Sequence, residues 1–181
     1  MSLPLGHATA GLTVAVIFAN REEFSLKKYS YYVWAVILSG LPDIDFFLYL
    51  IVPDSHLAFI YRHTVTHSIP FFIVITPMLI WVLPWKPRWR CAMIAFSILT
   101  LHSVMDCLYR DTPVTFLWPF SNAMVNYELL PDIKIMGDMN VLIQPYTLFH
   151  TIVEGVIGLI IFILVVKLKW RALSHDQTAF S

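Results

Sequence analysis

Ionisable side chains recur at four-residue spacing inside apolar stretches of this 181-residue chain. Three such pairs are present: His63 with His67, His102 with Asp106, and His150 with Glu154. Residues four apart share one face of a helix, so each pair can bind one metal ion or two adjacent ones. Charged groups are costly to place inside membrane helices, and each therefore needs a partner or a function.

An acidic element, Leu41-Pro42-Asp43-Ile44-Asp45, interrupts the second apolar stretch. On a regular helix, residues at i and i+2 would point about 200° apart. The Gly-Leu-Pro sequence before Asp43 favours a bent turn, which lets one or both carboxylates point inward. His7, by itself near the N-terminus, completes a set of nine candidate ligands.

This set of five histidines and four carboxylates suits Zn²⁺ best, with Mn²⁺ or Fe²⁺ as alternatives. Nine ligands exceed one tetrahedral site and fit two, or three, ions with bridging carboxylates. Clustered metal ions generate hydroxide near neutral pH and hold the oxygens of an in-line displacement at phosphorus. The residues therefore predict phosphoester hydrolysis.

Within this chemistry, Asp43 is expected to be a metal ligand, and Asp45 a ligand or the general base. Arg62 and Arg110 are candidates for binding a phosphate oxygen of the substrate. Anchoring to lipid headgroups is an equally good explanation of these two arginines.

The composition is that of a membrane protein. Hydrophobic residues make up 58% of the chain and charged residues 13%, whereas globular proteins have about 45–50% and about 25%. Twelve basic and twelve acidic residues balance, so we expect no nucleic-acid partner. Two cysteines cannot form a disulfide framework, and no phosphate-binding glycine motif is present.

Five apolar stretches, at 3–20, 30–52, 67–83, 91–108 and 149–166, are separated by short polar segments. Each is about as long as a bilayer core of about 30 Å requires. We predict an all-α, polytopic bundle of about five transmembrane helices that forms one integral membrane domain over residues 1–181. The first stretch lacks the features of a cleavable signal peptide.

Lysine and arginine determine the predicted orientation. Alternating spans place nine of the twelve basic residues on one face, so we expect the N-terminus outside and the C-terminus in the cytoplasm. Residues 109–147 then form an outer loop and residues 167–181 a cytoplasmic tail. All nine candidate ligands fall at one depth on the outer side. Because the orientation uses only lysine and arginine, this agreement independently supports a single polar centre.

Each motif also has an ordinary structural explanation. One His-x-x-x-His sequence is common by chance, and a buried His-Asp pair is more often a structural hydrogen bond. His150 with Glu154 can cap a helix, and Asp43 with Asp45 can form a loop turn. Their common depth favours a shared site over these separate explanations.

Several segments resemble the membrane-bound metal-dependent hydrolases, also described as YdjM-like, LexA-binding, inner-membrane-associated hydrolases. The matching segments are His7, 41–45 (LPDID), 63–68 (HTVTHS), 102–106 (HSVMD) and 117–121 (LWPFS). The combination of PDxD with HxxTHS is fairly specific, and the matches cover most of the chain. The resemblance implies a metal-dependent hydrolase of the bacterial inner membrane.

A more distant similarity is to zinc-dependent phospholipase C and related single-strand nucleases, helical proteins with a three-zinc cluster. It implies the following ligands here: His7, Asp43 or Asp45, His63 or His67, His102 with Asp106, and His150 with Glu154. Those enzymes also use a free mature N-terminus and one further histidine before HxxxE. We expect neither here, which favours two ions over three.

The leading hypothesis is a phospholipase C-like hydrolase that cleaves a phosphoester of a lipid or lipid-linked substrate at the outer leaflet. Its expected partners are membrane lipids, and its oligomeric state is left open. Di-iron desaturases need HxxHH elements, and HH occurs nowhere in the sequence. The alternatives are a metal or proton transporter, which would distribute polar groups across the bilayer, and a regulatory membrane protein with a structural metal site.

Overall fold

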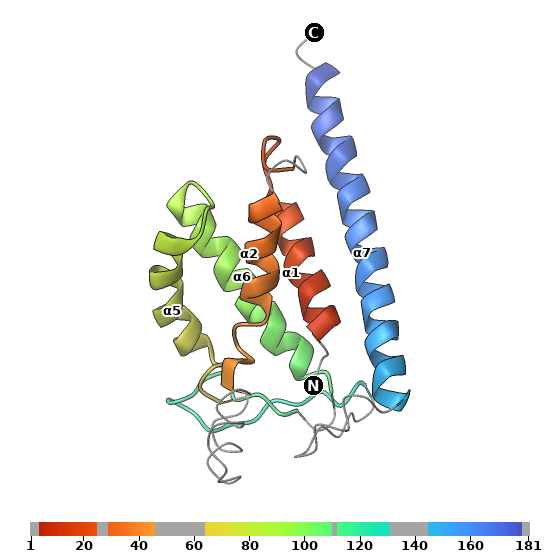
Figure 1. The fold of residues 1–181 in the computed structure, drawn as a ribbon. Coiled ribbons are helices and arrows are strands. Elements are labelled where there is room, and N and C mark those ends of the chain that lie inside the picture. Colours follow the sequence, from red (N-terminus) through yellow and green to blue (C-terminus); the bar gives the residue numbers. More distant parts are fainter. Residues whose placement is uncertain (1–3, 25–28, 46–63, 110–111, 131–144, 179–181) are drawn as a thin grey trace.

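The structure is a computed structural model that describes residues 4–24, 29–45, 64–109, 112–130 and 145–178. Within these residues the fold is all-helical, as predicted. Its helices are α1 (Pro4–Phe18), α2 (Tyr29–Ser39), α5 (Ile69–Val82), α6 (Arg88–Asp106) and α7 (Pro145–Thr178). Successive helices alternate in direction, so α1, α5 and α7 begin at the end of the molecule where α2 and α6 finish (Figure 1). We call this the site end.

Four of the helices are shorter or more polar than a full membrane span. Helices α1, α2 and α5 have 15, 11 and 14 residues, against about 20 for a span. Helix α6 has 19 residues, but Arg88 and Arg90 lie in its first turn. Among the described residues, only Pro145–Ser174 of α7 is long and apolar enough to cross a membrane by itself. The expectation of about five transmembrane helices is therefore not met in the described residues, where one helix qualifies as a span by its length and composition.

The second apolar stretch is broken at the acidic element. Helix α2 ends at Ser39, and Gly40 and Pro42 follow it. Proline disfavours helical conformation in the residue before it, and glycine weakens a helix through its backbone freedom. Asp43 consequently lies in a turn beyond α2, as the sequence predicts.

The third apolar stretch becomes helical two residues later than expected. Ser68 is the N-cap of α5, and its hydroxyl accepts a hydrogen bond from the Phe71 amide at 3.3 Å. His67 therefore lies in the turn before α5. This corrects the expectation that His67 opens a helix on which it shares a face with His63, a residue outside the described part of the chain.

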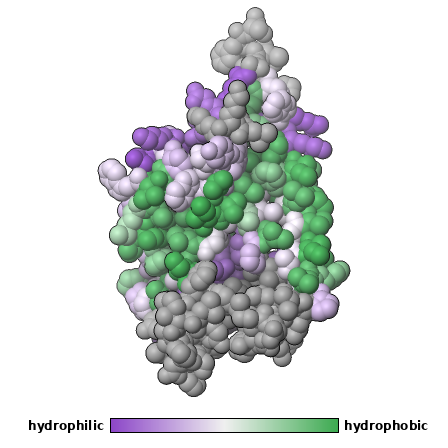
Figure 2. All heavy atoms as spheres, in the orientation of Figure 1, coloured by the Kyte–Doolittle hydropathy of each residue, from purple (hydrophilic) through white to green (hydrophobic). Residues whose placement is uncertain are grey.

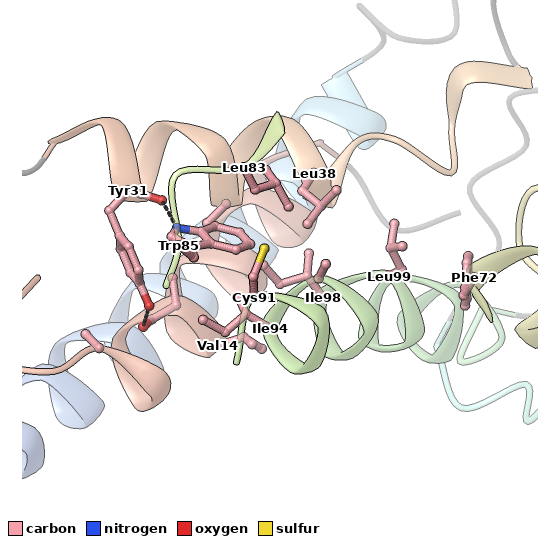
Figure 3. Close-up of a cluster of buried hydrophobic side chains, with 14 residues drawn as sticks. Val14, Tyr31, Leu38, Phe72, Leu83, Trp85, Cys91, Ile94, Ile98 and Leu99 are labelled. Atoms are coloured by element: carbon pink, nitrogen blue, oxygen red, sulfur yellow. Dashed lines mark hydrogen bonds between the residues drawn. The ribbon is translucent and has the colours of Figure 1, made fainter. Parts of the chain in front are cut away.

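The apolar core lies between α1, α2, α5 and α6 (Figure 3). Trp85, in the connection from α5 to α6, is fully buried, and its indole N–H donates to the Tyr31 carbonyl oxygen at 3.3 Å. The Tyr31 hydroxyl in turn donates to the Ala15 carbonyl oxygen at 2.9 Å. These bonds tie α1, α2 and the α5–α6 connection together.

A glycine allows α1 and α2 to pack closely. A Cβ atom at Gly11 would lie 2.8 Å from both the Ala35 carbonyl oxygen and Ser39 Cβ, closer than real Cβ contacts come. Burial of the last turn of α2 against α1 therefore requires glycine at position 11. This contact determines where Ser39 sits.

Helix α7 packs against α1, its one helical neighbour in the described part of the chain. A Cβ atom at Gly158 would lie 2.0 Å from Thr9 Oγ1, so glycine permits this approach too. Most apolar side chains of α7 remain exposed. Figure 2 shows an apolar band around the helices and hydrophilic residues toward the end opposite the site.

Basic residues gather at that opposite end. There, Arg90 forms a buried ion pair with Glu23 and also donates to the Phe18 carbonyl oxygen. Lys169 of α7 donates to the Ile17 carbonyl oxygen at 3.0 Å. Among the described residues, these basic side chains thus lie at the end of the bundle opposite the site end, together with Glu23.

Candidate metal centre

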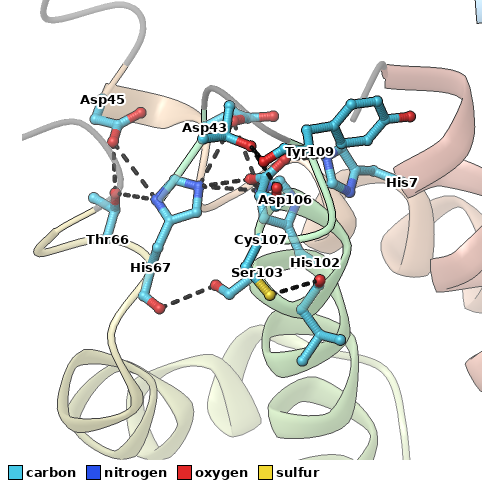
Figure 4. A network of polar contacts seen from close by, with 12 residues as sticks. His7, Asp43, Asp45, Thr66, His67, His102, Ser103, Asp106, Cys107 and Tyr109 are labelled. Atoms are coloured by element: carbon cyan, nitrogen blue, oxygen red, sulfur yellow. Dashed lines mark hydrogen bonds and ion pairs between the residues drawn. The ribbon is translucent and has the colours of Figure 1, made fainter. Parts of the chain in front are cut away.

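Four side chains from three parts of the chain meet at the site end (Figure 4). Asp43 comes from the turn after α2, His67 from the turn before α5, and His102 and Asp106 from the last turns of α6. Each offers one ligand atom, and the four atoms lie within 4.8 Å of one another. His67, His102 and Asp106 are buried, whereas the Asp43 side chain is 20% exposed.

Three of the distances between these atoms are close to those in a tetrahedral coordination shell, and the two measured from Asp43 are longer. The Nε2 atoms of His67 and His102 are 3.2 Å apart, and each lies 3.2 Å from Asp106 Oδ2. Asp43 Oδ1 lies 3.8 Å from His67 Nε2 and 3.6 Å from His102 Nε2. Zinc–nitrogen bonds of about 2.0–2.1 Å at tetrahedral angles place ligand atoms about 3.3 Å apart. The group therefore fits a single ion.

Hydrogen bonds on the far side of each imidazole orient the rings. His102 Nδ1 lies 2.6 Å from the Ser39 carbonyl oxygen, which can only accept, so Nδ1 carries the proton. His67 Nδ1 lies 3.0 Å from Thr66 Oγ1. Both rings thus direct Nε2 toward the two carboxylates, and partners of this kind hold metal-binding histidines in place.

His7 adjoins this group from α1. Its ring stacks on that of His102 with centroids 3.7 Å apart, and its Nε2 lies 3.4 Å from Asp106 Oδ1. His7 is 2% exposed, and neither of its ring nitrogens has a hydrogen-bond partner among the residues that the structure describes. The two oxygens of Asp106 therefore face different histidines: Oδ2 faces His67 and His102, and Oδ1 faces His7.

Six of the nine sequence-predicted ligands come together here. They are His7, Asp43, Asp45, His67, His102 and Asp106. Asp45 lies on the outer side of the His67 ring, with its Oδ2 3.7 Å from Nδ1, and does not belong to the four-atom group. Its carboxylate therefore contacts a ligand from behind.

Two other predicted ligands, His150 and Glu154, are described by the structure and are not part of the group. His150 and Glu154 lie in the first turns of α7, and the His150 ring packs against Tyr146 with centroids 4.4 Å apart. His63, Arg62 and Arg110 lie outside the described residues, so their predicted roles as ligand or phosphate-binding residues stay predictions.

Two contacts at the site were not expected from the sequence. The Ser39 carbonyl oxygen is a main-chain atom and leaves no sequence signal. Thr66 does leave one, because it directly precedes His67 within the HxxTHS segment. A third contact, from the buried Ser103 hydroxyl to the His67 carbonyl oxygen at 3.0 Å, holds the turn against α6.

The fold and the site define an all-helical protein with a membrane-spanning candidate helix and a buried group of residues that could bind a metal ion. The family model of the YdjM inner membrane protein matches residues 1–176, and the chain belongs to this family. The predicted YdjM-like resemblance and a membrane location are thereby confirmed at the level of the family. No curated protein and no solved structure matches the chain.

Proposed function

We propose that this protein is a membrane-embedded metal-dependent hydrolase that cleaves a phosphoester in a lipid or lipid-linked substrate. The observation that carries the proposal is the group of Asp43, His67, His102 and Asp106. With both histidines protonated at Nδ1, two nitrogen lone pairs and two carboxylates converge on one point. Such an arrangement of acceptors is costly to bury unless a cation occupies its centre.

Zinc is the best candidate for this ion, because two imidazoles and two carboxylates at tetrahedral spacing suit it. Mn²⁺ and Fe²⁺ accept the same donor types. His7, together with Asp106 Oδ1, supplies the beginning of a second ligand set, for which Asp106 would be the bridging carboxylate. His150 and Glu154 remain candidates to complete that set. We therefore propose two ions.

Asp43, His67, His102 and Asp106 would hold a zinc-like ion, which would supply an activated water as the nucleophile near neutral pH. Within the group, Asp43 is the most exposed residue and the one farthest from the two histidines. Water and substrate therefore have their access beside Asp43, whereas the other three side chains are enclosed. Asp43 is thus both a ligand and the carboxylate best placed to accept a proton there.

We also propose that the helices cross the inner membrane together, with the site end outside. The short helices α1, α2 and α5 leave the site end close to the membrane interface, where lipid headgroups carry their phosphoesters. The exposed apolar side chains of α7 and the position of the basic residues at the opposite end support this orientation.

One observation favours a second candidate, a regulatory membrane protein with a structural metal site. All four positions of the tetrahedral group are filled by protein side chains, and structural zinc sites are closed in this way whereas catalytic sites keep one position open. The hydrolase proposal requires water to enter beside Asp43. The two functions therefore differ in what Asp43→Asn does.

The test uses the full chain, purified in detergent without chelator and supplied with Zn²⁺. Metal content is measured by mass spectrometry. Hydrolysis is measured with a chromogenic phosphodiester and with a panel of phospholipids.

The wild type should hydrolyse at least one of these substrates. Asp43→Asn, which removes a charged ligand, should lower the metal content, and the protein that still holds metal should lose about 10²–10⁴-fold in turnover. Glu22→Gln, an exposed residue at the opposite end, is the control. Bound metal without any hydrolysis would support the structural site instead.

A further inference from the structure

Asp45 and Thr66 form a buried cluster with the Nδ1 side of the His67 ring, away from the ligand group. Thr66 Oγ1 lies 2.8 Å from Asp45 Oδ2 and 3.0 Å from His67 Nδ1. Asp45, Thr66 and His67 are 6%, 9% and 0% exposed. The hydroxyl thus contacts both a carboxylate and an imidazole, whose own atoms lie 3.7 Å apart, where bulk water has little access (Figure 4).

The number of protons determines the direction of each bond. A threonine hydroxyl has one proton to donate, and an ionised carboxylate can only accept. The hydroxyl therefore donates to Asp45, and its lone pair accepts from His67 Nδ1–H. With the proton on Nδ1, the neutral imidazole has its lone pair on Nε2, the atom that faces His102 and Asp106.

We propose that Asp45 is a positioning residue that acts through Thr66 to hold His67 in its metal-binding tautomer and orientation. This inference rests on the proposed metal site. It differs from the sequence-based expectation that Asp45 is a ligand or the general base, because the Asp45 carboxylate contacts His67 from the side opposite the ligand group. Partners of this kind typically contribute about 10–100-fold to metal affinity.

The chain offers a matched control for this role. Ser103 also has a buried hydroxyl and also contacts His67, but it donates to the His67 backbone carbonyl oxygen at 3.0 Å. Loss of the Ser103 hydroxyl therefore removes a bond to the same residue without changing the partner of the ring. A difference between variants at positions 66 and 103 isolates the effect on the imidazole.

The affinity experiment titrates Co²⁺ and Zn²⁺ into the purified full chain in the presence of a competing chelator. Thr66→Val and Asp45→Ala should each weaken binding by about 10–100-fold. Thr66→Ser and Asp45→Asn retain a hydroxyl and an acceptor oxygen, and should restore most of the affinity. Ser103→Ala should weaken binding less than Thr66→Val does, because the His67 ring keeps its Thr66 partner. Because Thr66 and Asp45 act in series, the double variant Thr66→Val with Asp45→Ala should bind about as well as Thr66→Val.

A spectroscopic measurement separates positioning from general stability. In protein labelled with ¹⁵N-histidine, the metal-free wild type should show His67 protonated at Nδ1, whereas Thr66→Val should show a mixture of tautomers. This holds even if the chain binds neither metal, so failure of the metal site and failure of this inference are distinguishable. Wild-type affinity together with an unchanged tautomer in Thr66→Val would overturn the proposal, and so would Ser103→Ala weakening binding as much as Thr66→Val.

Discussion

The Ser39 carbonyl oxygen lies 2.6 Å from His102 Nδ1 and links the last residue of α2 to a metal-ligand candidate on α6. This bond orients His102, so the geometry of the centre depends on where α2 ends. The end of α2 is held against α1 at Gly11, where a Cβ atom would meet Ser39 Cβ at 2.8 Å. A packing contact without any ionisable group therefore supports the site.

The first prediction concerns this contact. Gly11→Ala should lower the free energy of unfolding by about 1–3 kcal/mol, because the added methyl group overpacks the interface and displaces Ser39. It should also weaken Zn²⁺ binding. The measurements are thermal unfolding and metal titration of the purified chain. Gly155→Ala is the control, since its Cβ would meet only the Leu5 side chain, at 3.4 Å or more. Equal behaviour of the two variants would contradict the proposed link.

The second prediction concerns metal content. Native mass spectrometry of protein purified with Zn²⁺ should detect about two ions per chain in the wild type. His7→Ala should retain one ion, because His7 contacts Asp106 Oδ1 and lies outside the four-atom group. Asp106→Ala should retain none, since both oxygens of this carboxylate face histidines. Full occupancy in Asp106→Ala would show that the ligand group is wrong.

The third prediction concerns metal removal. An ion that binds only the folded state stabilises it by about 4 kcal/mol when the free ion concentration is about 1,000 times the dissociation constant. A chelator should therefore lower the melting temperature of the wild type measurably. His102→Ala should have a lower melting temperature that the chelator does not change further. A chelator effect of the same size in both proteins would place the stabilising ion elsewhere.

The fourth prediction concerns the contact between α1 and α7. Gly158→Ala should destabilise the protein, because its Cβ would lie 2.0 Å from Thr9 Oγ1. Gly155→Ala should be tolerated, since its nearest neighbour would be Leu5 Cδ1 at 3.4 Å, a side-chain end that can move. Adding Thr9→Gly to Gly158→Ala should restore stability in thermal unfolding. If it did not, contacts other than Thr9 would determine the effect.

The fifth prediction concerns orientation in the membrane. Single cysteines introduced at Lys86 and Lys169 should react with a membrane-impermeant reagent from the cytoplasmic side, and one at Lys134 from the outer side. The native Cys91 and Cys107 are buried and should contribute little background. Labelling of the Lys134 position from the cytoplasm would reverse the orientation and place the site at the inner leaflet.

The amino-acid sequence by itself determined the local parts of the centre. His102 and Asp106 lie on one face of α6, because the period of the helix places residues four apart side by side. Asp43 lies in a turn beyond α2, because Gly40 and Pro42 oppose continuation of the helix. The all-helical class followed equally from apolar stretches too long for strands.

Only the tertiary structure decided which of these parts meet. Spacing in the sequence pairs His67 with His63 and gives no sign of the contact with His102, which is 35 residues away in the chain. Asp43 and Asp45 are equivalent in the sequence, but Asp43 joins the ligand group and Asp45 contacts His67 from behind. The physical reason is that periodicity and turn chemistry act over a few residues. The meeting of helix ends instead depends on close contacts such as those at Gly11, Ser39 and Ser103, which join segments distant in sequence.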